Sequence, residues 1–229
     1  MEVILKAENL NKYFHDPDEF HVIRNISLSV KEAEFVSLIG KSGSGKSTLM
    51  YLLATLDTAY EGSIEINDTL LSGKTQNELA AFRNEHIGFI FQFHFLLPEF
   101  TVLENVMMPA LKLNKMDRCT IEYRAMERLS QMGMNTYAHK LAAKLSSGQQ
   151  QRVAIARALI NNPCIIMADE PTGNLDSVNT EIIFEIFREL AKQGNTIIAV
   201  THDQDFAAKS DRTIEMTDGQ IILDPARGN

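Results

Sequence analysis

Residues 40 to 47 read Gly-Lys-Ser-Gly-Ser-Gly-Lys-Ser, which is the pattern of a phosphate-binding loop. The glycines let successive backbone N–H groups turn toward a polyphosphate, and the helix that starts at the end of the loop adds unpaired donors and a positive dipole end. Lys46 is expected to reach the β- and γ-phosphates, and the Ser47 hydroxyl to bind magnesium. The predicted nucleotide-binding residues here are Gly40, Lys41, Ser42, Gly43, Ser44, Gly45, Lys46, Ser47 and Thr48.

A second group of polar residues follows a buried strand. Asp169 and Glu170 come directly after the apolar run Ile165–Ala168. Phosphoryl-transfer enzymes place a magnesium ligand at this edge of a sheet, so Asp169 is expected to hold the metal, directly or through water. Because side chains alternate along a strand, Glu170 is expected to point differently and to accept a proton from an attacking water. Two such acids alone also fit a solvated turn, but beside a phosphate loop they predict nucleotide hydrolysis.

The third candidate is the start of a helix predicted for Gln150–Ile160, which stops before Pro163. Ser146 and Gln149 fit a capping box, and that local role is the structural alternative. A helix start with hydroxyl groups and a glycine that permits close backbone approach is also an anion site. Two anion sites in one chain suggest one nucleotide shared between two chains. The residues of this second site are Leu145, Ser146, Ser147, Gly148 and Gln149.

The elements that position these groups follow from the alternation of short apolar runs with longer amphipathic ones. Phe35–Ile39 predicts a buried strand that leads into the phosphate loop, and Leu49–Ala54 predicts the helix that leaves it. The runs at Ile87–Phe91, Ile165–Ala168 and Ile197–Val200 predict further strands. This order indicates an α/β sheet with parallel members.

Other segments depart from that order. Val3–Leu10 and Ile23–Val30 predict an antiparallel portion around a polar turn at 15–19. Arg212–Met216 and Gln220–Leu223 predict a hairpin, and 226–229 a frayed end. Between about 99 and 145 only helical patterns occur, which predicts an inserted helical subdomain. We therefore expect a single domain over 1–229 with an α/β P-loop core, a mixed parallel sheet, an antiparallel β portion and this subdomain.

Composition excludes several classes of protein. The chain has 229 residues, is 45% hydrophobic and carries a net charge of −8, which disfavours a nucleic-acid partner. It has no apolar run near the roughly 18 residues of a membrane span and no export signal at its start, so we expect a cytosolic location. Cys119 and Cys164 have neither metal-ligand spacing nor a disulfide framework.

In their order along the chain, these motifs resemble the ATP-binding subunits of ABC transporters. Gln92, Asp176 and His202 complete that order. The resemblance implies a head-to-tail homodimer that closes over two ATP molecules, each between the phosphate loop of one chain and residues 145–149 of the other. It also implies that Gln92 binds magnesium and senses a membrane partner, that Asp176 lies in the loop joining the two sites, and that His202 contacts the γ-phosphate. Ser147 replaces the commoner glycine of the family, and we do not infer inactivity from it.

The resemblance also implies an aromatic platform for adenine. Family members tend to show Lys-x-aromatic in this region, which selects Phe14 in the segment Asn9–Phe14. Stacking on a nucleobase is worth about 1–3 kcal/mol in nucleic-acid complexes. Tyr13 would then face the other way, although a slip of one residue exchanges the two rings, and either ring could belong to the core.

Residues 89–101 further resemble the lipoprotein-releasing ATPases and their macrolide-exporter relatives. That resemblance implies an ATPase, converting ATP and water to ADP and phosphate with Mg²⁺, on the cytoplasmic face of a bacterial inner membrane. A permease would dock near Gln92–Phe100, unless Phe93, Phe95, Leu96 and Leu97 only fill the core. The alternatives are an FtsE-like regulatory ATPase, a MacB-type exporter subunit or a soluble ABC ATPase without a transport role.

Overall fold

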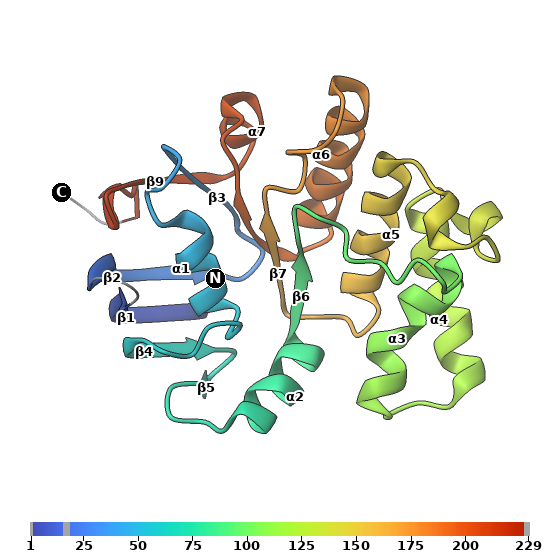
Figure 1. Cartoon of the computed structure of the whole chain (residues 1–229), viewed down its shortest axis with the longest axis horizontal. Coiled ribbons are helices and arrows are strands. Elements are labelled where there is room, and N and C mark those ends of the chain that lie inside the picture. Colours follow the sequence, from blue (N-terminus) through green and yellow to red (C-terminus); the bar gives the residue numbers. More distant parts are fainter. Residues whose placement is uncertain (1, 16–18, 227–229) are drawn as a thin grey trace.

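The computed structural model describes residues 2–15 and 19–226 and contains two sheets (Figure 1). The larger sheet has the strand order β10-β9-β3-β8-β7-β6. Its five strands from β9 to β6 run parallel, and β10 pairs with β9 as an antiparallel hairpin. The strands are β3 (Phe35–Gly40), β6 (Ile87–Ile90), β7 (Ile165–Asp169), β8 (Thr196–Val200), β9 (Arg212–Thr217) and β10 (Gln220–Leu223).

The central strands are buried on both faces, and each face contributes to a different core. In β7, Ile165 and Met167 belong to the core that includes α1 (Lys46–Leu53), whereas Ile166 and Ala168 belong to the core on the other side. Every residue of β7 and of β8 is buried, which explains why these strands are continuous apolar runs in the sequence. By the same alternation, Asp169 belongs to the face that carries α1.

The smaller sheet is antiparallel and packs beside α1 (Figure 1). Its order is β2-β1-β4-β5. The strands at 3–10 and 23–30 were predicted, and both are longer in the structure. The predicted turn at 15–19 and frayed end at 226–229 fall largely outside the described residues. The four strands are β1 (Val3–Phe14), β2 (Phe20–Lys31), β4 (Glu61–Ile66) and β5 (Thr69–Leu70), and of these β4 and β5 were not predicted from the sequence.

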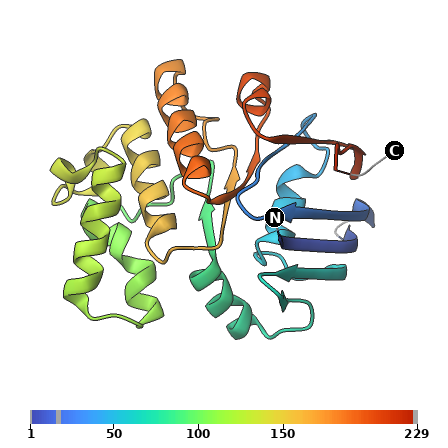
Figure 2. The ribbon, with the colours of Figure 1, turned by 180° about the vertical axis from the view of Figure 1, so that it is seen from behind.

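Helices cover the rest of the larger sheet, and α3, α4 and α5 gather at the end away from the smaller sheet in both views (Figures 1 and 2). Thr101 and Glu104 form a capping box at the start of α3. The helices are α2 (Gln76–His86), α3 (Val102–Leu113), α4 (Arg118–Gln131), α5 (Ser147–Leu159), α6 (Ser177–Lys192) and α7 (Gln204–Ala208), with short 3-10 turns at Asn135–Tyr137 and Ala142–Lys144. Within the described residues, none of these helices has the length and apolar character needed to span a membrane.

Candidate nucleotide-binding site

The phosphate loop joins β3 to α1 through glycines that no other residue could replace without strain. Gly45 is the N-cap of α1, has a φ of 95° and gives no side-chain cap to the helix. A Cβ on Gly40, which has a φ of 147°, would lie 2.1 Å from the carbonyl oxygen of Met216. The first-turn amides of α1 are therefore left without a side-chain partner and are available to an anion.

A cavity of about 380 Å³ opens at this loop. It gathers residues from the start of α1 and from the ends of β7 and β8, which are distant in sequence. Of the predicted nucleotide-binding and catalytic residues, those that line it are Gly40, Ser42, Gly43, Gly45, Lys46, Ser47, Thr48, Glu170 and His202, together with Val22 from β2.

The Lys46 ammonium lies inside the loop. Its Nζ donates to the carbonyl oxygens of Gly40 at 2.9 Å and Lys41 at 2.8 Å. Burial lowers the pKa of Lys46, and the charges of Glu170 and Asp169 partly oppose that shift. The cation is thus held by neutral carbonyl groups and has no carboxylate in direct contact, which suits it to an incoming phosphate.

Ser47, which lines the cavity, contacts Asp169, which does not line it. The Ser47 hydroxyl donates to Oδ1 of Asp169 at 2.9 Å. Burial raises the pKa of Asp169, and the neighbouring Ser47 and Tyr51 hydroxyl groups act against that rise. Burial, with a smaller effect of the neighbouring carboxylate, raises the pKa of Tyr51 to about 12.

These oxygens fit magnesium better than a metal that prefers nitrogen or sulfur. Among the described residues, no group of three or more His, Cys, Asp or Glu side chains could hold a metal ion alone. Magnesium commonly binds through one or two protein oxygens and completes its shell with phosphates and water. The Ser47–Asp169 pair beside a phosphate loop is consistent with that mode.

Glu170 does not continue the strand conformation of β7. The expectation that strand alternation directs its side chain was therefore wrong. Its φ is 46°, in the left-handed region, so strand alternation does not set the direction of its side chain. The Glu170 carboxylate lines the cavity, and its Oε1 lies 3.5 Å from Nδ1 of His202. His202 itself is 68% exposed in its side chain and comes from the segment after β8. The structure therefore brings the Glu170 and His202 side chains to the same cavity as Lys46, the third residue predicted to be catalytic.

Gln92 follows β6 and lies next to Glu170 without lining the cavity. A Cβ built on Gly173 would be 2.9 Å from Gln92 Nε2 and 3.2 Å from Glu170 Oε2, so the two side chains approach the same glycine. The Asn174 amide donates to the Gln92 carbonyl at 3.2 Å. The structure thus places the predicted metal ligand beside the predicted base.

The segment 145–149 lies at the start of α5, and none of these residues lines the cavity described above. Ser146 and Gln149 form the capping box, and α5 begins at Ser147, earlier than the predicted start at Gln150. The position of Gly148 is tightly packed, because a Cβ there would lie 2.1 Å from Oδ1 of Asn179. Asp176 caps α6 by accepting from the Asn179 backbone at 2.8 Å, so Asp176 joins this second cluster.

The two rings considered for adenine have different surroundings. Tyr13 stacks on His21, with ring centroids 4.1 Å apart and an interplanar angle of 15°. Phe14 is 46% exposed, and Lys12 Nζ lies 5.1 Å from its ring centroid. Neither ring lines the cavity. One face of the Tyr13 ring is covered by His21, whereas the Phe14 ring is accessible.

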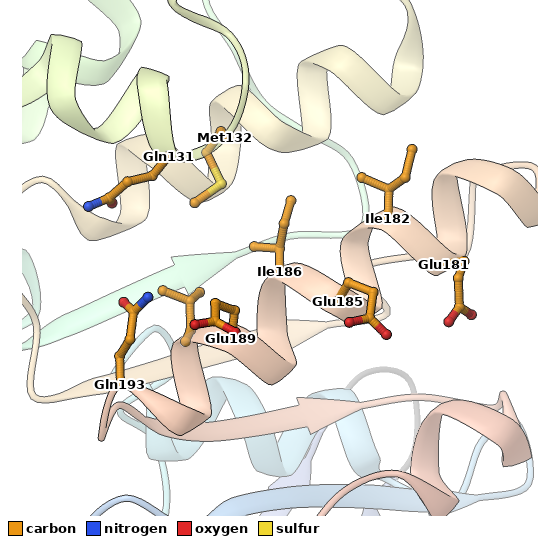
Figure 3. Close-up of a pocket in the computed structure, with 9 residues that line it drawn as sticks. Gln131, Met132, Glu181, Ile182, Glu185, Ile186, Glu189 and Gln193 are labelled. Carbon is orange, nitrogen blue, oxygen red and sulfur yellow. The ribbon is translucent and has the colours of Figure 1, made fainter.

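A separate groove of about 490 Å³ lies between α6 and the end of α4 (Figure 3). Ile182 and Ile186 project from one side of α6, and acidic side chains project from the other. Among the described residues, no cation lines this groove. The acids pair with neighbouring cations instead, in the pairs Glu181–Lys209, Glu185–Arg188 and Glu189–Lys192. Acidic side chains without a cation disfavour phosphate in this groove, so the cavity at the phosphate loop is the better candidate for the nucleotide site.

Comparison with known proteins agrees with this site. The family model described as ABC transporter matches residues 23–173. This chain belongs to the ABC transporter family, and its fold is that of an ABC ATPase cassette, as the sequence predicted.

Named relatives narrow the comparison. The chain is 46% identical to "Lipoprotein-releasing system ATP-binding protein LolD" of Aquifex aeolicus, with 97% of each chain covered. It is also 46% identical to the LolD protein of Bacteroides fragilis, with 96% of this chain and 100% of that one covered.

Two solved structures share the fold. They are the dimeric structure of MJ0796, a bacterial ABC transporter cassette, and the dimeric post-hydrolysis state of MJ0796 bound to ADP and Pi. Each has a TM-score of 0.89 and 38% identity, and the alignment covers 98% of this chain and 100% of the other.

Proposed function

We propose that this chain is the ATP-hydrolysing subunit of a lipoprotein-releasing ABC complex. The observation that carries the catalytic part is the joining of Ser47 and Asp169 at 2.9 Å beneath a phosphate loop, with Glu170 lining the same cavity. The likeness to LolD proteins over nearly the whole chain supports the biological role.

Each residue of the site has a distinct task in this proposal. The loop amides and Lys46 hold the phosphates of ATP, while Ser47, Gln92 and Asp169 hold Mg²⁺, which when bound neutralises charge on the phosphates. Glu170 accepts the proton of the water that attacks the γ-phosphate, giving ADP and phosphate. His202 lies 3.5 Å from Glu170, so it can contact the γ-phosphate and orient that carboxylate. Phe14 supplies the adenine platform.

A homodimer completes the site. Residues 145–149 and Asp176 lie outside the cavity of their own chain, and the Ser146, Ser147 and Asp176 side chains are exposed. We propose that they meet the nucleotide bound to the phosphate loop of a second copy. The dimeric state of the similar cassette MJ0796 supports this arrangement.

The permease is proposed to dock on the loop after β6. Phe93 and Phe95 are 62% and 63% exposed, and Leu97 and Phe100 are exposed as well, whereas Leu96 packs against the core. A neighbouring groove of about 250 Å³ has Phe89, Phe91, Pro109 and Arg157 among its lining residues. This combination suits a short apolar helix of a membrane partner.

This docking places the chain on the cytoplasmic face of a bacterial inner membrane as a peripheral subunit. In the same proposal, residues 1–229 are one ABC domain, and the helices between about 99 and 145 act as its helical subdomain. Residues of α3, α4 and α5 belong to the same hydrophobic core. In this proposal, a displacement of the subdomain is therefore transmitted to α5.

The test is reconstitution with a candidate permease of the lipoprotein-releasing type from the same organism. Proteoliposomes that hold both proteins and a fluorescent lipoprotein should release the lipoprotein to a soluble carrier only when MgATP is present. ATP hydrolysis without release would contradict the lipoprotein role and favour an FtsE-like regulator or a MacB-type exporter. A Phe93→Ser chain should hydrolyse ATP alone but lose its binding to the permease, which separates docking from catalysis.

A further inference from the structure

Gln151 is a buried polar residue that the sequence analysis did not single out. It lies on α5, is 1% exposed, and donates from Nε2 to the carbonyl oxygen of Pro171 at 2.8 Å. Pro171 directly follows Glu170, the proposed base. A side chain of α5 therefore holds the segment that carries the base, one residue away from it.

The backbone conformation of Glu170 needs such support. Its φ of 46° lies in the left-handed region, which is unfavourable for a residue with a Cβ. The ring of Pro171 also pushes the residue before it toward extended conformations. Two local preferences thus oppose the observed conformation, and a conformation of this kind persists only where the surrounding structure determines it.

The segment of Glu170 and Pro171 is held from several directions. The Glu170 N–H donates to the Val200 carbonyl at 3.0 Å, and the Glu170 carbonyl accepts from the Gly173 N–H at 3.1 Å. These two are backbone bonds that any side chains would permit. The bond from Gln151 comes from a side chain, so it is the one that depends on residue type.

The second polar atom of the Gln151 amide shows that packing alone does not explain this residue. Within the described part of the chain, Oε1 of Gln151 is buried and has no hydrogen-bond partner. A buried oxygen without a partner reduces stability. An apolar side chain of the same shape would avoid that cost, so the donation to Pro171 is what explains an amide here.

Gly148 shares this face of α5 with Gln151. The two residues are three apart on the helix and therefore lie on the same side of it, and both are buried. Gly148 packs against Asn179 at the start of α6. Since residues 145–149 form the second proposed site, α5 joins that site to the segment of Glu170 within one chain.

We infer that Gln151 is a positioning residue, which holds the segment of Glu170 so that its carboxylate faces the water that attacks ATP. This inference rests on the proposed function, because it concerns Glu170 as the base. Gln151 does not line the nucleotide cavity. Its loss should therefore lower the rate of hydrolysis and leave the affinity for ATP unchanged.

The test compares Gln151→Met with Asn195→Leu. The first keeps the length of the side chain and removes the donor to Pro171. The second removes an amide that donates to the Leu190 carbonyl at 2.8 Å. Asn195 precedes β8, at the edge of the sheet opposite the cavity, so it controls for the loss of one amide-to-carbonyl bond. The kcat of ATP hydrolysis, the equilibrium affinity for a labelled ATP analogue and the melting temperature are measured for each chain.

We expect Gln151→Met to lower kcat about ten- to hundredfold, because a small displacement of a catalytic group has effects of this size. Its affinity for the analogue should match that of the parent. Its melting temperature should stay close to that of the parent, because the unpaired Oε1 is removed together with the bond. Asn195→Leu should keep the kcat of the parent.

A double variant tests whether Gln151 acts through Glu170. Adding Gln151→Met to Glu170→Gln should hardly change the residual hydrolysis, because no base is left to be positioned. An equal reduction of hydrolysis in the two backgrounds would overturn the inference. So would an unchanged kcat in Gln151→Met, or a loss of affinity as large as the loss of kcat.

If Gln151→Met is unstable, Gln151→Asn takes its place. It keeps an amide but is one methylene shorter, which withdraws the donor from Pro171, so kcat should again fall. An unchanged kcat in Gln151→Asn overturns the inference. A parent chain that does not hydrolyse ATP, or a Glu170→Gln chain with full turnover, would instead contradict the proposed function.

Discussion

The chain presents two helix starts rich in serine and glycine, and they are built differently. α1 begins at Gly45 without any side-chain cap, whereas α5 begins after Ser146 with a complete capping box. The open amides of α1 face a cavity formed within the same chain, while α5 starts at a surface where Ser146 and Ser147 are exposed.

The difference indicates how one nucleotide can be divided between two chains. No side chain of the same chain caps the backbone amides at the start of α1, so these amides favour binding a phosphate even in a single chain. The start of α5 satisfies part of its own amide donors through Ser146 and Gln149, which stabilises it when no ligand is near. Under the proposed function, the first site recruits ATP and the second engages it only when a second copy arrives.

The largest expected effect concerns chemistry at the first site. Glu170→Gln keeps the shape of the side chain but cannot accept a proton, so the hydrolysis rate should fall about 10²- to 10⁴-fold. ATP binding should persist, as an equilibrium titration with a labelled nucleotide would show. The control is Glu189→Gln on the far groove, which should hydrolyse ATP like the parent. Unchanged turnover in Glu170→Gln would remove Glu170 from the mechanism.

The next effect separates binding from chemistry at α1. Lys46→Ala removes the cation held inside the loop, and ATP affinity should fall about 10- to 100-fold, the range expected for hydrogen bonds to a charged group. Lys112→Ala in α3 is a matched control, because Lys112 is exposed and does not line the cavity. Equal losses in the two variants, measured by calorimetry, would contradict the assigned role of Lys46.

The third prediction concerns the second site alone. Gly148→Ala would bring a Cβ to 2.1 Å from Asn179 Oδ1, and Asn179 is held by Asp176, so the Asn179 side chain or the start of α5 must shift. ATP binding to the single chain should survive, and hydrolysis should fall about tenfold or more, since 1.4 kcal/mol of lost contact suffices for that factor. Ser147→Gly, the commoner family form, is the control and should keep its activity. Loss of ATP binding in Gly148→Ala would show that the two helix starts are not separate sites.

The fourth prediction uses pH. Burial raises the pKa of Asp169, so the folded chain holds its proton more tightly than the unfolded chain does. Stability is therefore lost as pH rises from the usual carboxyl range through the raised pKa. In the absence of metal and nucleotide, Asp169→Asn should be more stable than the parent at neutral pH by about 2–4 °C, the shift that 1 kcal/mol gives in a chain of this size.

This gain should shrink in acid, where the carboxyl group of the parent is protonated in both states. Thermal melts of both chains at neutral and acidic pH provide the measurement. If the variant is less stable than the parent at neutral pH, the ionised Asp169 carboxylate stabilises the metal-free fold, which contradicts the prediction.

The smallest effect tests the internal cap. Ser146→Ala removes one donor–acceptor pair of the capping box and should cost about 1 kcal/mol, which lowers the melting temperature by about 2–4 °C. Thr75→Ala, at the capping box of α2, is the matched control and should cost a similar amount without changing ATP hydrolysis. If Ser146→Ala leaves hydrolysis unchanged as well, α5 has only the structural role.

The sequence predicted the parts of the site that depend on local backbone chemistry. The phosphate loop, the strand before it and the box at Ser146 follow from spacings of a few residues, and the comparisons confirm the family and fold class. The Ser47–Asp169 contact could be predicted from the sequence, because the carboxyl ends of parallel strands meet at one edge of the sheet.

Features set by distant contacts were missed. The strands β4 and β5 are short, and β4 is stabilised by pairing with β1, which is distant in the sequence. Such pairing leaves no local pattern to predict from. Glu170 takes a left-handed φ that no strand pattern predicts. The capping box of Thr75 and Glu78 at the start of α2 is a local pattern that could have been predicted from the sequence, but it was overlooked.

The central claim is that MgATP joins two copies of this chain. The most direct measurement is the mass of Glu170→Gln in solution by light scattering, with and without MgATP, beside the same chain that also carries Gly148→Ala. The account predicts that MgATP doubles the mass of the first and leaves the second single. A Glu170→Gln chain that binds MgATP and stays single, alone and with its permease, would contradict it.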